Sequence, residues 1–289
     1  ETYDVSERSC GSSSDQHCQP GIHVVGLAED GGEVGAYAEE GRLSQRNLAR
    51  IAHQQAKANG DHSVDSDEDH EAGIGAGSRE VYLIPQPLSA ALGMDLPIST
   101  PSGNMVVSLG GGVNQVAIIS INGIVAGEAS RTGGQILDEA IVAYVRKRFG
   151  VIIGMPTAEL IKIKVGAAIP QEQQLSIEVQ GQDQITSFPR PVILTTDDIV
   201  EALQDPLEDI VKMTRKVMEK TPPELISDII DRGAAMCGGG SLLRGIDKFL
   251  TKAIGIPIYM VDNPLTCTAE GAVKALEIRE QLGKSISSG

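Results

Sequence analysis

Two runs of three consecutive glycines constrain the fold of this chain more than any other feature. The first glycine turn, Gly110–Gly112, follows the apolar run Met105–Leu109, and the second glycine turn, Gly238–Gly240, follows Ala234–Met236. Glycine tolerates positive φ and carries no Cβ, so such turns let backbone N–H groups approach a phosphate closely. A single glycine turn is more often a corner of a sheet. Two of them together favour one nucleotide-shaped cleft with a turn on each side.

From Glu80 onward, short β-branched runs alternate with amphipathic helical patterns, which is typical of an α/β architecture. We expect strands at Val81–Ile84, Met105–Leu109, Val116–Ser120, Leu175–Val179, Arg190–Leu194 and Ala234–Met236. The second and third of these predict a β-hairpin around the first glycine turn. We expect helices at Asp138–Phe149, from Asp197 to the break at Pro222, with Thr196 as its cap, at Glu224–Ile230, and from near Leu242.

The first seventy residues have a different composition from the rest. All five His residues lie before Glu71, whereas all three Phe residues lie after it. The stretch up to Gly21 is polar and residues 61–71 form an acidic run, which indicates solvated chain. A thin apolar stripe predicts one helix there, at Leu43–Ala58. Scattered His residues in such a segment are more typical of a polar tail than of a metal site.

Composition excludes several classes of function. The formal net charge of -15 argues against nucleic-acid binding, which needs clustered Lys and Arg. No apolar run approaches the length of a membrane span, and no leader pattern is present, so we expect a cytoplasmic protein. The four cysteines, Cys10, Cys18, Cys237 and Cys267, lack metal-ligand spacing and are expected to be free thiols.

Two further segments are candidates for ligand contact. Cys237–Ser241 lies between a predicted strand and the helix predicted near Leu242, so its amides would sit at a helix N-terminus, where a nucleoside or phosphate can pack. Thr157–Lys162 lies between the two glycine turns. Its Glu159 and Lys162 are three residues apart and so share a helix face. A surface ion pair between these two side chains is the alternative interpretation.

Six stretches in unbroken order carry a likeness to a known family. They are Ser78–Ile84, Met105–Gly112, Ser130–Gly134, Thr221–Leu225, Cys237–Gly245 and Asp262–Cys267. On these residues, from about Gly75 to the C-terminus, the chain resembles MreB, the bacterial actin of rod-shaped cells. The resemblance implies an α/β, actin-like ATPase fold with a ribonuclease H-like motif, in which the second domain is complete and the first only partly present.

The resemblance also implies a domain layout. Residues 1–70 would be a divergent, poorly ordered segment. Residues 71–104 and 267–289 would be the remnant of the first domain. Residues 105–132 and 197–266 would form the inner subdomain of the second domain, and residues 133–196 its outer subdomain.

For function, the resemblance implies a cell-shape protein of the cytoskeleton that binds ATP and Mg²⁺ between two domains. Its partners would be further copies of itself or an intact MreB-like filament, together with proteins of cell-wall morphogenesis, at the cytoplasmic face of the inner membrane. The implied phosphate contacts are Gly110, Gly111, Gly112 and Val113. Gly238, Gly239, Gly240 and Ser241 would border the adenosine, and Glu159, Leu160, Ile161 and Lys162 would flank the base or ribose.

Four positions at or near the first glycine turn depart from the family pattern. Ser108 and Gln115 stand where the family has Asp and Glu, and Gln135 replaces the Asp of a Gly-Gly-Asp motif. Val113 also replaces a hydroxyl residue. Gln115 is the candidate catalytic residue, but a neutral amide can orient a water and cannot act as a carboxylate base. We therefore expect impaired hydrolysis, at most a weak ATPase, and weak or lost Mg²⁺ binding.

The family's first phosphate turn has no counterpart before Glu71, so we expect the strand in Val81–Leu92 to lack strands to pair with. Filament formation and membrane association are left open by this gap. Three functions remain: an MreB-like protein with an impaired nucleotide cleft, an active ATPase or sugar-kinase-like phosphoryl-transfer enzyme of the same superfamily, or the product of a disrupted reading frame.

Overall fold

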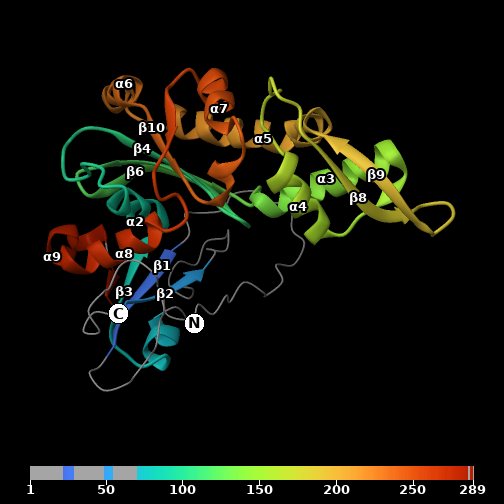
Figure 1. Ribbon diagram of the computed structural model, residues 1–289. Coiled ribbons are helices and arrows are strands. Elements are labelled where there is room, and N and C mark those ends of the chain that lie inside the picture. The colour runs from blue at the N-terminus through green and yellow to red at the C-terminus, as the bar shows by residue number, and fades with distance from the viewer. Residues whose placement is uncertain (1–21, 29–48, 55–69, 286, 289) are drawn as a thin grey trace.

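The computed structural model describes residues 22–28, 49–54, 70–285 and 287–288 (Figure 1). Strands in these residues form three sheets, with strand orders β12-β3-β1-β2, β11-β10-β4-β5-β6 and β7-β8-β9. Their bounds are β1 Ile22–Ala28, β2 Ala49–Gln54, β3 Ser78–Pro85, β4 Asn104–Leu109, β5 Asn114–Ser120, β6 Gly123–Ser130, β7 Val151–Ile152, β8 Ser176–Asp183, β9 Pro189–Thr195, β10 Ala234–Cys237, β11 Ile258–Met260 and β12 Ser287–Ser288.

The helices cover the sheets, and several of them begin at most four residues after the end of a strand. Their bounds are α2 Gln86–Gly93, α3 Gly134–Phe149, α4 Met155–Val165, α5 Thr196–Glu219, α6 Pro223–Arg232, α7 Ile246–Ile254, α8 Cys267–Glu277 and α9 Arg279–Leu282, with short 3₁₀ turns η1 Gly239–Leu242 and η2 Gly283–Ser285. Within the described residues, no helix is long and apolar enough to cross a membrane.

The five-stranded sheet is the centre of the molecule. β4 pairs with β5 in the antiparallel hairpin that was predicted around the first glycine turn, and its other edge pairs in parallel with β10. Every residue of β4 and β5 is buried, so helices cover both faces of the sheet. Side chains of a strand alternate between faces. We call the two sides the α5 face and the α8 face.

The α5 face carries the largest apolar core. Met105, Val107 and Ile118 pack there against Leu203 and Leu207 of α5. The spacing of apolar residues along α5 predicts this packing, because they recur on one side of the helix. Helix α5 begins at a capping box, in which the Thr195 hydroxyl accepts from the Asp198 amide and the Asp198 carboxylate accepts from the Thr195 amide. The predicted cap, Thr196, was wrong by one residue.

The α8 face is covered by α2 and α8, which lie unusually close to each other. A Cβ on Gly271 would stand 1.7 Å from the Ser89 carbonyl oxygen, and one on Gly93 would stand 1.7 Å from that of Cys267. The Ser89 hydroxyl also donates to the Thr268 carbonyl at 2.7 Å. Only glycine at both positions permits this contact, which makes α2 and α8 one packed unit.

The sheet containing β3 corrects two predictions about the N-terminal segment. β3 pairs with β1, which in turn pairs with β2, so the strand in Val81–Leu92 does not lack partners. β2 also lies inside Leu43–Ala58, where a helix was predicted. The thin apolar stripe was a weak local signal, and pairing with β1 outweighs it. The predicted polar stretch up to Gly21 and the acidic run lie outside the described residues, apart from residues 70–71.

Candidate functional site

The first glycine turn is held by the N-terminus of α3. The Gly110 amide donates to the Val113 carbonyl at 3.1 Å, which closes the turn. The amides of Gly134 and Gln135 donate to the carbonyls of Gly110 and Gly111 at 2.9 and 2.8 Å. A Cβ on Gly133 would stand 2.5 Å from the Gly111 carbonyl oxygen. Turn and helix therefore meet backbone to backbone.

The second glycine turn lies against the end of β4. Gly238 has φ +86°, and a Cβ there would stand 2.3 Å from the Leu109 carbonyl oxygen. The Ser241 hydroxyl donates to the Gly238 carbonyl at 2.7 Å. The turn continues into η1, and α7 begins at Ile246, so the predicted helix is present but starts about four residues later than the predicted Leu242. Gly245, in the left-handed region, separates the two elements.

The two glycine turns lie side by side instead of facing each other across a wide gap. Gly110, Gly133, Gly134 and Gly240 line one cavity between them, and its volume is about 10 Å³. Such a space holds about one water molecule. The reason is that β4 and β10 are adjacent parallel strands, so both turns leave the same edge of the sheet. A nucleotide on these turns would have to lie over them, on their open side.

Helix α4 reaches the first glycine turn through Lys162. Its ammonium donates to the Gly134 carbonyl at 3.0 Å and lies 2.8 Å from the carboxylate of Asp138. Burial raises the pKa of Asp138, Lys162 opposes this rise, and Glu159 adds to it. The ion pair of Lys162 is therefore with Asp138 on α3. The alternative of a surface pair with Glu159 is not what the structure shows.

The other predicted residues of α4 have different surroundings. Glu159 and Leu160 are exposed, whereas Ile161 is fully buried in the core of the α5 face. The end of α4 contacts the segment that follows the second glycine turn, because the Arg244 guanidinium donates to the Gly166 carbonyl at 3.2 Å. The first turn, Lys162 and the second turn thus share one neighbourhood, while the Ile161 side chain lies outside it.

A buried polar cluster lies on the α8 face beneath the first glycine turn. Ser108 and Gln115 are paired across β4 and β5, and each is 2% exposed. The Gln86 amide nitrogen donates to the Ser108 hydroxyl at 3.5 Å. The Gln115 amide oxygen is buried without a hydrogen-bond partner in the described part of the chain. A buried acceptor left unpaired is costly and is a common mark of a ligand-binding position.

Sequence reasoning missed Gln86. It opens α2 directly after β3, between Pro85 and Pro87, and the only signal was this strand-to-helix junction. The cluster of Gln86, Ser108 and Gln115 carries no charge, and the described residues hold no group of three or more His, Cys, Asp or Glu that could bind a metal ion. Neutral donors fit Mg²⁺ poorly, since it is usually held through carboxylates and phosphates.

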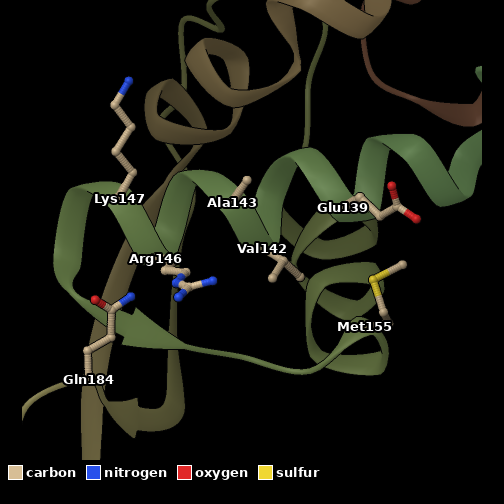
Figure 2. Close-up of a pocket in the computed structure, with 7 residues that line it drawn as sticks. All are labelled: Glu139, Val142, Ala143, Arg146, Lys147, Met155 and Gln184. Atoms are coloured by element: carbon tan, nitrogen blue, oxygen red, sulfur yellow. The ribbon is translucent and has the colours of Figure 1, made fainter.

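A larger groove lies elsewhere, beside α3 and the start of α4 (Figure 2). Its volume is about 550 Å³, and it is lined by Glu139, Val142, Ala143, Arg146, Lys147, Met155 and Gln184. The groove runs along α3 toward the start of α4. It contains none of the residues predicted to bind a nucleotide, so it is separate from the glycine turns.

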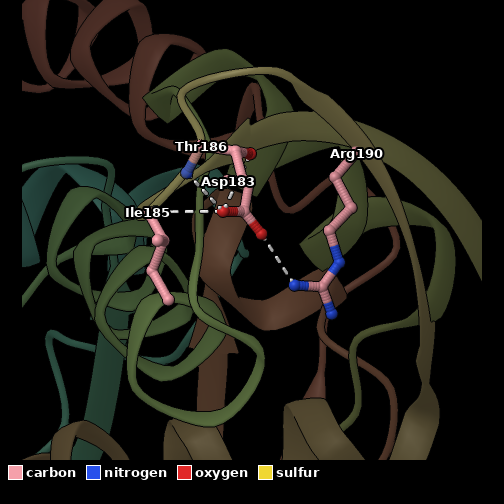
Figure 3. A network of polar contacts seen from close by, with 4 residues as sticks. All are labelled: Asp183, Ile185, Thr186 and Arg190. Carbon is pink, nitrogen blue, oxygen red and sulfur yellow. Dashed lines mark hydrogen bonds and ion pairs between the residues drawn. The ribbon is translucent and has the colours of Figure 1, made fainter.

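The turn that follows β8 is stabilised by Asp183 (Figure 3). Its carboxylate accepts from the amides of Ile185 and Thr186, each at 2.9 Å, and from the Arg190 guanidinium at 2.9 Å. The Thr186 amide, Arg190 and the Ile185 amide lower the pKa of Asp183 well below its ordinary value. The predicted turn at Gln180–Thr186 is therefore shorter, because β8 continues to Asp183.

Comparison with known proteins identifies the family of this chain. The family model described as MreB/Mbl protein matches residues 59–284. The cell shape-determining protein MreB of Pasteurella multocida is 49% identical over 220 residues, which are 75% of this chain and 63% of the relative. This chain belongs to the MreB/Mbl family. The family match begins before the compositional break near Glu71, so that break does not mark its boundary.

Other MreB/Mbl relatives agree with this assignment. Mbl of Bacillus subtilis is 37% identical over 222 residues, covering 77% of this chain and 67% of the relative. Among solved structures, MreB 5 of Spiroplasma citri bound to AMPPNP has a TM-score of 0.72 at 27% identity, over 76% of this chain and 66% of that one. The predicted actin-like fold is confirmed. The chain spans 63% of the length of the MreB relative from Pasteurella.

Proposed function

We propose that this chain is a nucleotide-binding, cell-shape protein of the bacterial actin type whose hydrolysis is impaired. One observation carries the proposal: Gly134 joins the first glycine turn to Lys162 through its amide and its carbonyl, and the second turn abuts the same strand end. Three segments predicted to contact a nucleotide thereby meet in one place. The Spiroplasma citri relative has been solved with ADP and with AMPPNP, which supports ATP as the ligand class.

The roles follow from the positions of the residues. Backbone amides of Gly110–Val113 would bind phosphate, and Gly238–Ser241 would border the adenosine. Glu159, Leu160 and Lys162 would flank the base or ribose, while Ile161 fixes α4 to the core. The Asp138 carboxylate balances the charge of Lys162, so this lysine would position the turn more than it would attract phosphate.

Impaired hydrolysis follows from the neutral cluster on the α8 face. The unpaired oxygen of Gln115 can accept a hydrogen bond from a water, which would orient it. An amide cannot take the proton of that water, and a general base contributes about 10²–10⁴-fold to such reactions. We therefore expect slow phosphate release and weak dependence on Mg²⁺.

The test restores a carboxylate at this position. We expect Gln115→Glu to release phosphate from ATP faster than the unchanged chain, by at least about tenfold, in a magnesium-dependent assay. Gln173→Glu, at an exposed position, is the matched control and should change nothing. Calorimetry with an ATP analogue checks binding separately, and an affinity weaker than micromolar is expected.

Two results would contradict the proposal. Phosphate release by the unchanged chain at the rate of the Pasteurella MreB would show that hydrolysis is intact and would favour an active ATPase or kinase-like enzyme. Absence of analogue binding at millimolar concentration would remove the nucleotide site itself.

Assembly is proposed from family membership. Its partners would be further copies of this chain or an intact MreB-like filament. Proteins of cell-wall morphogenesis would be further partners of such a filament. Pelleting and electron microscopy with and without ATP test self-assembly, and vesicle flotation tests membrane contact. A folded, protease-resistant segment around β1 and β2 would count against a disrupted reading frame, because the pairing of these strands with β3 requires an N-terminal segment that folds.

A further inference from the structure

One side of helix α3 carries a row of side chains that line the large groove. They are Glu139, Val142, Ala143, Arg146 and Lys147, and their spacing of three and four residues keeps them on the same side of the helix. Val142 is half-buried and packs on the core of the α5 face, whereas the other four are exposed. We call this row the α3 stripe.

The two ends of the α3 stripe carry opposite charges. Glu139 lies at one end, next to Met155 of α4, and Arg146 and Lys147 lie at the other, where Arg146 points toward Gln184 (Figure 2). Within the described residues, none of these three charged side chains forms an ion pair. The groove therefore has an anionic end and a cationic end, and neither charge is balanced by the described part of the chain.

This order of charges is complementary to its own reverse. Glu139 lies three residues before Val142, and Arg146 lies three residues after Ala143. A half-turn about a point between Val142 and Ala143 therefore exchanges the anionic end with the cationic end. Two antiparallel α3 helices related by such a twofold axis would place Glu139 of each copy opposite Arg146 of the other. A parallel pair of helices would place like charges together, which is unfavourable.

The middle of the α3 stripe suits close contact between two helices. Ala143 has the smallest side chain of the row, and the distance between packed helices depends on the side chains at the contact. Val142 and Met155, which is 40% exposed, supply apolar surface next to it. The stripe thus has an apolar centre with charged residues at its ends, which is the usual arrangement of a protein–protein interface.

We propose that the α3 stripe is a self-association surface, through which two copies of this chain form a twofold dimer with antiparallel α3 helices. Glu139 and Arg146 form two equivalent ion pairs in this dimer. One helix and a groove bury less area than a standard stable interface, so the dissociation constant should be on the order of 10 µM. Because the ion pairs lie at the surface, high salt should weaken the dimer.

This contact differs from the contacts of a filament. A twofold contact closes at two copies, whereas a head-to-tail contact can extend indefinitely. The dimer also needs no nucleotide, because the groove is separate from the glycine turns. The inference adds a surface to the self-assembly proposed above and rests on that proposal only in taking a second copy as the partner.

Charge reversal of the full chain, without nucleotide, is the primary experiment, and analytical ultracentrifugation is the measurement. In Glu139→Arg two cations face each other at both ends, and in Arg146→Glu two anions do, so each variant should dimerise at least about tenfold more weakly than the unchanged chain. An equimolar mixture of the two variants should dimerise again, because every reversed charge then meets its opposite. Arg148→Glu, the same charge change at an exposed position of α3 outside the groove, is the matched control.

The mixture also checks folding, since two misfolded variants would not restore a dimer. Three results would overturn the proposal. They are an unchanged chain that stays monomeric at about 100 µM, ten times the expected dissociation constant, reversed variants that dimerise as well as the unchanged chain, and a mixture that stays monomeric.

A crosslink tests the twofold geometry. Ala143→Cys, in a chain with Cys10→Ser and Cys18→Ser, should form a disulfide with the same residue of the second copy, because a residue near a twofold axis lies close to its own symmetry mate. Gln173→Cys, at an exposed position away from α3, should not crosslink. Equal crosslinking of the two variants would overturn the twofold arrangement.

Pelleting with ATP separates this inference from the proposed filaments. Filaments formed by an unchanged chain that never dimerises would overturn the twofold contact and leave the proposed self-assembly standing. A dimer without nucleotide that passes the charge-reversal test, in a chain that forms no filaments, would support the twofold contact and count against filament assembly.

Discussion

The two faces of the central sheet differ in chemistry although they are built by the same strands. On β4, Val107 points to the α5 face and packs in an apolar core, while its neighbour Ser108 points to the α8 face among Gln86, Gln115 and Cys237. Both side chains are buried, at 0% and 2% exposure. The α5 face is a scaffold, and the α8 face holds the polar groups that a ligand could use.

This division has a physical basis. An apolar face gains stability with every buried methylene, whereas each buried polar atom needs a partner. The unpaired oxygen of Gln115 shows that the α8 face gives up some stability. Stability and function should therefore respond differently to changes on the two faces.

The largest effect is expected on the α5 face. Ile118→Ala removes a fully buried side chain and should lower the free energy of unfolding by about 2–5 kcal/mol through lost burial and a cavity. Nucleotide affinity of the folded fraction should stay the same. Urea denaturation and calorimetry measure the two quantities, and a loss of affinity in the folded protein would break the distinction between the faces.

The second glycine turn lies close to the end of β4, and two glycine-to-alanine variants can measure how much this close contact matters. Gly238 and Gly255 both have positive φ, +86° and +83°, but only Gly238 is close to another backbone group, the Leu109 carbonyl. Gly255→Ala should cost about 1–2 kcal/mol from backbone strain alone. Gly238→Ala should cost about 2 kcal/mol more because of the steric clash. Equal melting temperatures would show that the turn can move away from β4.

Glu128, on β6, is a buried charged residue beside the otherwise apolar α5 face. Burial raises its pKa, but Lys220 and Lys216, at the C-terminal end of α5, outweigh that effect, so the pKa of Glu128 lies below the ordinary value of 4.5. A carboxyl group whose pKa is lowered by folding stabilises the fold at pH values above its ordinary pKa. This contribution to stability is lost as the pH falls through the pKa of the folded state. Glu128→Gln should cost about 1–2 kcal/mol near pH 7, discounted because both lysines are partly exposed.

The difference in unfolding free energy between this variant and the unchanged chain should shrink as the pH falls below 4.5. Glu178→Gln, at an exposed position on β8, serves as the control and should show no such difference. Parallel curves for the unchanged chain and Glu128→Gln across the acidic range would show that the lysines do not stabilise this carboxylate.

The smallest effect, and one of opposite sign, is expected on the α8 face. Gln115→Met keeps the side-chain length and removes the unpaired oxygen, so the free energy of unfolding should rise by about 1 kcal/mol. Phosphate release should fall at the same time. Thermal melting and the magnesium-dependent assay check both. A lower melting temperature would mean that the amide has a partner in solution, such as an ordered water.

The sequence was sufficient for the elements that have a strong local pattern. The hairpin of β4 and β5, the helix α5 and the strand β10 are all predicted from alternation, helical spacing and glycine turns. The same pattern could not reveal how close the two turns lie, because that depends on the parallel pairing of β10 with β4. Nor could it show that Ile161 is buried in the core, because the neighbours of a helix face depend on how the helix packs in the folded chain.

Long-range pairing also explains the other errors. β1 and β2 have weak patterns of their own and become strands through their contact with β3. Gln86 gains its significance from its contact with Ser108, which lies 22 residues away in the sequence. A polar residue in a strand, such as Ser108, is a usable signal for such a cluster, because it marks a buried position where an apolar residue would be the default.

The parallel pairing of β4 with β10 has a consequence for how the chain folds during synthesis. β4, β5 and β6 follow one another and can form their hairpins as soon as they leave the ribosome. The other edge of β4 pairs through Met105 with Ala234, which is made much later. Until then a buried, apolar strand has an open edge that can bind a strand of another chain. Folding of the central sheet therefore ends with a slow, long-range step, and the nascent chain is most prone to aggregate before β10 appears.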